Sequence, residues 1–206
     1  MSKFKHVTGF GFEAETWDEK QVEAAQLVDQ LSSASEALSQ QVALVASRLG
    51  LWGSGLTNPE LADLLQQTKK TLEAAKIPKA RMDEILLPIK QRISYNYWKT
   101  AYRNLDAIYA HQYITNLPNQ NELKREQDEL FKLNQDELHT LDNDPRAMPR
   151  SIDQLLSVIN QSKVFKAPPD LSQELNDIND DLRFFVASDE DKLRRKIDLE
   201  KAYPWP

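Results

Sequence analysis

The clearest pattern in the chain is a run of positions spaced alternately three and four residues apart. It covers three heptads and consists of Val28, Leu31, Ser35, Leu38, Val42, Val45 and Leu49. This 3.5-residue period is typical of the seam of a coiled coil or of a long bundle helix. Thr16 and Glu19 have the spacing of a capping box, and Gly50 is placed as a C-cap. We therefore expect one helix over residues 16–49, about 50 Å long at about 1.5 Å per residue.

Apolar residues at helical spacing recur through the rest of the chain. They occupy residues 61–75, 79–116, 120–141, 152–159, 171–185 and a last segment that begins at Ser188. Asn58, followed by Pro59 and Glu60, predicts the N-cap of the second helix. Pro88 predicts a kink in the third helix, or a restart one turn later. The pattern predicts an all-α fold, an elongated antiparallel bundle of six or seven helices in which the long helices resemble those of coiled coils.

The chain divides by pattern into three parts. Residues 1–15 contain aromatic residues without a helical period, which predicts an irregular N-terminal arm. Residues 16–166 form the predicted helical bundle. Residues 167–169 read Ala-Pro-Pro, a stiff extended linker. Residues 170–206 then form a C-terminal helix pair with a proline- and aromatic-containing tail, which we expect to dock on the bundle.

Composition narrows the classes of function. Only five of the 206 residues are glycine, which disfavours a β-sandwich or a phosphate-binding loop, because both need many turns with positive φ. The chain contains no cysteine, which excludes disulfides, thiolate catalysis and cysteine-based zinc sites.

Charge is unevenly distributed along an acidic chain. The net charge is −6, yet residues 69–103 hold nine basic and three acidic residues. Neighbouring antiparallel helices neutralise this basic region, or it serves as a docking patch for an anionic partner. A stripe of aromatic residues lies on one helical face nearby and consists of Trp98, Tyr102, Tyr109 and Tyr113. Such a stripe favours packing in the core over the stacking of nucleic-acid bases. An acidic chain further disfavours nucleic acid as a partner.

The sequence contains few arrangements of residues that catalyse reactions or bind metal ions. His6, His111 and His139 lie far apart in the sequence, and no Gly-x-Ser-x-Gly motif is present. The glycines of residues 50–55 lack the strand and lysine of a phosphate loop, and residues 142–145 lack the glycine and glutamate of a calcium loop. We therefore expect no catalytic, cofactor-binding or metal-binding residues. An enzyme that uses carboxylates paired across helices is a third class, which the sequence cannot place.

Targeting signals are also absent from the sequence. No apolar run follows the first lysines, and no window reaches the roughly 18 apolar residues of a spanning helix. We expect a cytoplasmic location, with signal-less export left open.

Residues 42–56 are the most apolar segment. One interpretation is a buried helix end followed by a loop between helices. The other is an exposed tip, in which Leu51, Trp52 and Leu56 enter a lipid interface or a groove of a partner. The layout of a long helix running into an apolar tip is similar to that of helical pore-forming toxins.

These patterns favour a non-enzymatic helical module for protein–protein interaction or assembly. Its partner is another protein or a second copy of the chain. The seam of residues 28–49 and the helix of residues 120–141 would form the shaft of the bundle. The candidate contact residues are Leu51, Trp52, Leu56, Tyr203 and Trp205. The alternative is a soluble component that engages a membrane surface through residues 42–56.

Overall fold

A computed structural model describes residues 17–48, 56–140, 148–187 and 193. These residues form six α-helices and one short 3₁₀ helix, with no strand among them. The α-helices are α1 (Trp17–Arg48), α2 (Asn58–Ala74), α3 (Lys79–Thr115), α4 (Gln120–Thr140), α5 (Met148–Gln161) and α6 (Pro169–Ala187). The short helix η1 (Leu117–Asn119) joins α3 to α4. The all-α bundle expected from the sequence is confirmed. The predicted N-terminal arm and most of the last predicted helix lie outside the described residues.

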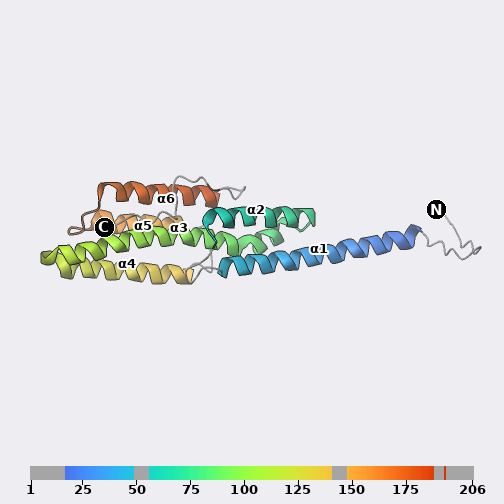
Figure 1. The fold of residues 1–206 in the computed structure, drawn as a ribbon, viewed down its shortest axis with the longest axis horizontal. Helices are drawn as coiled ribbons and strands as arrows, with labels where there is room; N and C mark the ends of the chain where they lie inside the picture. The colour runs from blue at the N-terminus through green and yellow to red at the C-terminus, as the bar shows by residue number, and fades with distance from the viewer. Residues whose placement is uncertain (1–16, 49–55, 141–147, 188–192, 194–206) are drawn as a thin grey trace, which may run out of the picture.

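The long helix α3 is the centre of the molecule (Figure 1). It contacts α1 and α2 along one half, and α4, α5 and α6 along the other. Helix α1 packs on α2 and α3, whereas α4 packs on α3 and α5. Figure 1 shows that the N-terminal half of α1 projects beyond the other helices. This projection gives the molecule an elongated outline.

The buried residues form one continuous core through all six helices. On α3 one apolar face is buried, at Ile89, Ile93, Tyr97, Trp98, Ala101, Leu105 and Ile108. On α6 the predicted residues Leu171, Leu175, Ile178, Leu182 and Phe185 are buried in the same core. Trp98 and Tyr109 are fully buried, so the aromatic stripe of α3 is mainly core, as the sequence favoured.

The second helix begins one residue earlier than the sequence predicted. Thr57, and not Asn58, is the N-cap of α2. Its Oγ1 accepts from the Glu60 backbone N–H at 3.3 Å, and its own N–H donates to Glu60 Oε2 at 2.8 Å. The two contacts form a capping box. Asn58 is buried instead, where its Oδ1 accepts from Asn96 Nδ2 at 2.7 Å, so its side chain binds α3 and does not cap α2.

Pro88 lies inside α3, and the helix does not restart after it. Proline has no N–H, so the carbonyl of Glu84 loses its intrahelical hydrogen bond. The neighbouring residues Ile85, Leu86 and Ile89 are buried in the core. Packing on both sides of Pro88 therefore holds the helix together through its 37 residues.

Candidate interaction surface on helix α1

Helix α1 packs on the rest of the molecule through a face of small and polar residues. Its buried residues are Ser39, Ala43 and Ala46. At one end of this face, Ser32 Oγ donates to the carbonyl of Ala75, just after α2, at 2.7 Å. Between α1 and α3, Arg81 Nε donates to Glu36 Oε1 at 2.6 Å. We call this side of α1 the inner face. Its small side chains allow close approach of α2 and α3.

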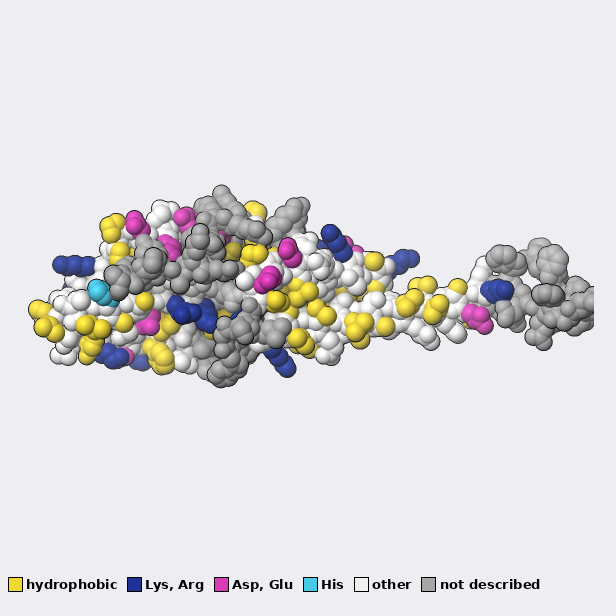
Figure 2. All heavy atoms as spheres, in the orientation of Figure 1, with side chains coloured by type: hydrophobic (Ala, Val, Ile, Leu, Met, Phe, Trp, Pro, Cys, Tyr) yellow, Lys and Arg dark blue, Asp and Glu magenta, His cyan; other side chains and the backbone are white. Residues whose placement is uncertain are grey.

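The predicted coiled-coil seam lies on a different side of α1. We define the α1 seam as Val28, Leu31, Ser35, Leu38, Val42 and Val45. Its five apolar side chains are between 41 and 67% exposed, and the adjacent Leu27 is 57% exposed. Figure 2 shows hydrophobic side chains along the projecting part of α1. The seam therefore does not form the shaft of the bundle with α4. It faces outward, about a quarter turn from the inner face at ~100° per residue.

A groove borders the seam where α1 passes the end of α2. It has a volume of about 440 Å³ and is lined by Val28, Leu31, Ser32, Ser35, Thr71, Ala74, Ala75 and Lys76. Three of its lining residues, Val28, Leu31 and Ser35, belong to the α1 seam. The groove and the seam thus form one continuous, largely apolar surface, which we call the seam–groove surface.

This surface carries almost no charge along α1. Between residues 30 and 47 the sole charged residue is Glu36, which is paired with Arg81. Glutamine, serine and alanine occupy most of the other positions around the seam. Exposed helix faces usually carry many charged residues, so an apolar, uncharged face about 25 Å long at ~1.5 Å per residue is unusual for a surface that meets only water.

Of the five contact residues predicted from the sequence, Leu56 alone is among the residues that the structure describes. Leu51 and Trp52, like Tyr203 and Trp205, lie outside the described residues. Leu56 is partly buried and packs against the core. Among the described residues, the structure therefore brings none of these candidates together.

The periodicity of the α1 seam is visible in the sequence, but its role as an exposed surface is not. A second set of regularly spaced residues on the same helix could have indicated that the seam is exposed. Ser32, Glu36, Ser39, Ala43 and Ala46 are also spaced alternately by four and three residues. On α1 the stripe of small and polar residues packs on the bundle, whereas the apolar stripe is exposed.

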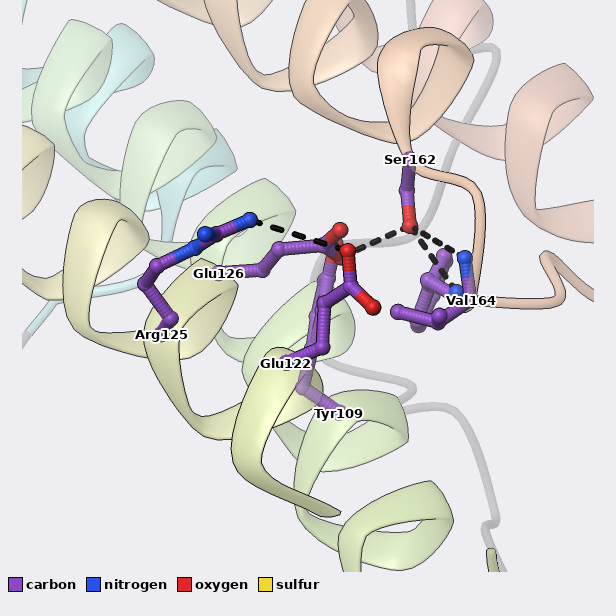
Figure 3. Close-up of polar contacts among 7 residues, drawn as sticks. Tyr109, Glu122, Arg125, Glu126, Ser162 and Val164 are labelled. Carbon is purple, nitrogen blue, oxygen red and sulfur yellow. Dashed lines mark hydrogen bonds and ion pairs between the residues drawn. The ribbon is translucent and has the colours of Figure 1, made fainter. Parts of the chain in front are cut away.

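A buried polar cluster lies between α3, α4 and the turn after α5 (Figure 3). The carboxylate of Glu126 accepts from the Tyr109 hydroxyl at 3.0 Å and from Ser162 Oγ at 2.7 Å. Ser162 Oγ in turn accepts from the backbone N–H groups of Val164 and Phe165. Burial and the nearby charge of Glu126 raise the pKa of Tyr109. These hydrogen bonds tie the turn after α5 to α3 and α4, so the cluster has a structural role.

The basic residues of α3 take part in two kinds of electrostatic interaction. Arg81 pairs with Glu36 and Glu84. Burial and the nearby positive charges of Arg103 and Arg92 lower the pKa of Lys99. The region therefore combines an internal ion pair at its start with mutual repulsion of cations further along α3.

The part of the chain that the structure describes contains no group of three histidine or acidic residues placed to hold a metal ion. None of its helices combines the length and hydropathy that a membrane-spanning segment needs.

Comparisons with known proteins give no further guide. No family model, no curated protein and no solved structure matches this chain.

Proposed function

We propose that this chain is a non-enzymatic helical assembly module that binds a helix of another protein molecule through the α1 seam. One observation carries the proposal: a coiled-coil seam lies exposed on a helix that projects from an otherwise well-packed bundle. Coiled-coil seams are buried by a facing helix, whose side chains interlock with theirs. The proposal includes a cytoplasmic location, which rests on the sequence alone.

The energy available at the seam fits reversible binding. Burying an exposed leucine or valine side chain completely contributes about 1.5–3 kcal/mol, so each half-exposed side chain of the seam contributes about 1 kcal/mol. Together with matching side chains on a facing helix, the total is on the order of 10 kcal/mol. Loss of rotational and translational freedom opposes this with about 4–15 kcal/mol. At the low end of that cost about 6 kcal/mol remains, which corresponds to a Kd of tens of micromolar, so we expect an association that responds to concentration.

The charge of α1 favours a protein partner over a membrane surface. Helices that lie on membranes usually carry lysine and arginine on the polar face, which attract anionic lipids. The only basic residues of α1 are Lys20 and Arg48, against five acidic residues. In a flotation assay with anionic and with neutral vesicles, we expect the protein to remain unbound. Flotation that is lost in Trp52→Asp, with helicity unchanged, would instead support the membrane-engaging alternative.

Site-specific photo-cross-linking tests the proposal. A photoreactive amino acid is placed at Leu38 on the seam, or at Val22 on the opposite side of the same helix. The two side chains are similarly exposed, at 67 and 56%, so Val22 controls for non-specific reaction. In a lysate of the producing cells, we expect Leu38 to form a discrete cross-linked protein product and Val22 to form none. Equal labelling at both positions, or none at either, would contradict the proposal.

A further inference from the structure

We infer that the helix received by the seam–groove surface is α1 of a second copy of this chain, aligned in parallel to form a two-stranded coiled coil. The inference rests on the proposed function and names its partner. Three features of the described residues support it: the residue types within the seam, the shape of the groove, and the charges around both.

The residue types match those that favour parallel two-stranded coils. With Val28 at heptad position a, the a positions hold Val28, Ser35 and Val42, and the d positions hold Leu31, Leu38 and Val45, so two of three positions of each kind have the residue type that the pattern requires. β-Branched residues at a combined with leucine at d favour pairs of parallel helices over larger assemblies. A second copy aligned in parallel presents the same residues in the same order. Each seam residue therefore lies opposite the same residue of the other copy.

The groove accounts for an exposed leucine outside the a and d positions. Leu27 occupies position g, and in a parallel pair a g residue faces an e residue of the partner helix. The e residue opposite Leu27 is Ser32, which lines the groove next to Ala74 and Ala75. Leu27 of each copy thus enters the groove of the other. The contact is the same in both directions, as a two-fold interface requires.

Charge and geometry also permit the pairing. Glu36 is the only charged residue between residues 30 and 47, and its pairing with Arg81 leaves no like charges to repel across the two-fold axis. The inner face lies about 100° around α1 from the seam, so the a and d positions of the seam face away from α2 and α3. The two bundles then lie on opposite sides of the paired helices.

Disulfide trapping of the full chain tests both the partner and its orientation. The chain has no cysteine, so one introduced cysteine has no partner within its own chain, and in the purified protein a disulfide between proteins joins two copies. Ser35→Cys places the thiol at an a position of the seam, where a parallel pair brings two Cα atoms within the roughly 4.4–6.8 Å that a disulfide spans. Ser33→Cys, on the exposed side away from the seam, is the matched control. With oxidised glutathione, we expect a covalent dimer from Ser35→Cys and little from Ser33→Cys.

Three results would overturn the inference, and they differ in what they mean for the proposed function. A protein that is dimeric by light scattering but shows no excess cross-linking at Ser35 would have a different orientation. A protein that stays monomeric, while its Leu38 photo-cross-links to a different protein, would keep the proposed function and lose self-pairing. Failure of both cross-links would remove both conclusions.

Discussion

At the scale of single residues, we expect the hydrogen bonds to the buried carboxylate of Glu126 to stabilise the folded protein. Its carboxylate is buried and accepts from Tyr109 and Ser162. Tyr109→Phe removes one donor and leaves a buried carboxylate with reduced compensation, which costs about 1–3 kcal/mol. We expect a corresponding loss in the free energy of unfolding, measured by urea denaturation. Tyr113→Phe, at an exposed tyrosine of the same helix, is the control and should change stability by less than about 0.5 kcal/mol. Equal effects of the two substitutions would show that the hydrogen bond to Glu126 is not important.

A second residue-scale prediction concerns pH. Burial raises the pKa of Glu174 in the folded protein, where the carboxylate accepts from Asn104 Nδ2 at 2.7 Å. A raised carboxyl pKa means that the folded state binds this proton more tightly than the unfolded state does, so ionisation of Glu174 opposes folding above its folded pKa. Glu174→Gln should therefore raise the melting temperature at neutral pH.

The advantage of Glu174→Gln should shrink as the pH falls through the raised pKa, and it should vanish below the ordinary pKa of 4.5, where Glu174 is protonated in both states. Thermal unfolding of both proteins across this range measures the difference. A difference that does not depend on pH would mean that the charge of Glu174 is not the cause.

At the scale of elements, the capping box of α2 gives a direct test of where the helix begins. Thr57→Ala removes the side chain that accepts from the Glu60 N–H and should destabilise the protein by about 1 kcal/mol. Thr71→Ala is the matched control within α2, because that hydroxyl only donates back to the carbonyl of Gln67 at 3.1 Å. Chemical denaturation should separate the two variants. A larger loss for Thr71→Ala would contradict the assignment of Thr57 as the cap.

The helices themselves could be predicted from the sequence. Which face of each helix is buried and which is exposed could not. The 3.5-residue period predicted a helix over residues 16–49, and α1 covers Trp17–Arg48. The period did not show which side of α1 is buried, because its small-residue stripe repeats in the same way as its apolar seam. Close approach of backbones at Ser39, Ala43 and Ala46 decides this, and close approach depends on the shapes of α2 and α3.

The cap of α2 and the course of α3 show the same limit. Asn58 has the right chemistry for a cap, yet a hydrogen bond from Asn96 on α3 holds its side chain. Pro88 usually ends a helix, yet the buried residues around it keep α3 continuous. In both places, packing between helices overrides the local preference. Local patterns contain no information on such contacts.

At the scale of the whole molecule, one core joins all six described α-helices, and the apolar seam of α1 lies outside it. The sequence favoured a contact surface at the apolar tip of residues 42–56 and at the C-terminal tail. The exposed seam is apparent only after the structure shows which stripe of α1 the bundle uses.

Sedimentation equilibrium of the full chain, over roughly 1 to 100 µM, tests the central claim most directly. The wild-type protein should show a monomer–dimer equilibrium. Leu38→Glu should raise its Kd at least about 100-fold, because each copy loses a partly exposed leucine whose burial contributes about 1 kcal/mol and gains a carboxylate that faces the carboxylate of the other copy. Val22→Glu, an equivalent change on the opposite side of α1, should leave the Kd unchanged. A wild-type monomer at every concentration, or a dimer that both variants weaken equally, would contradict pairing through the α1 seam.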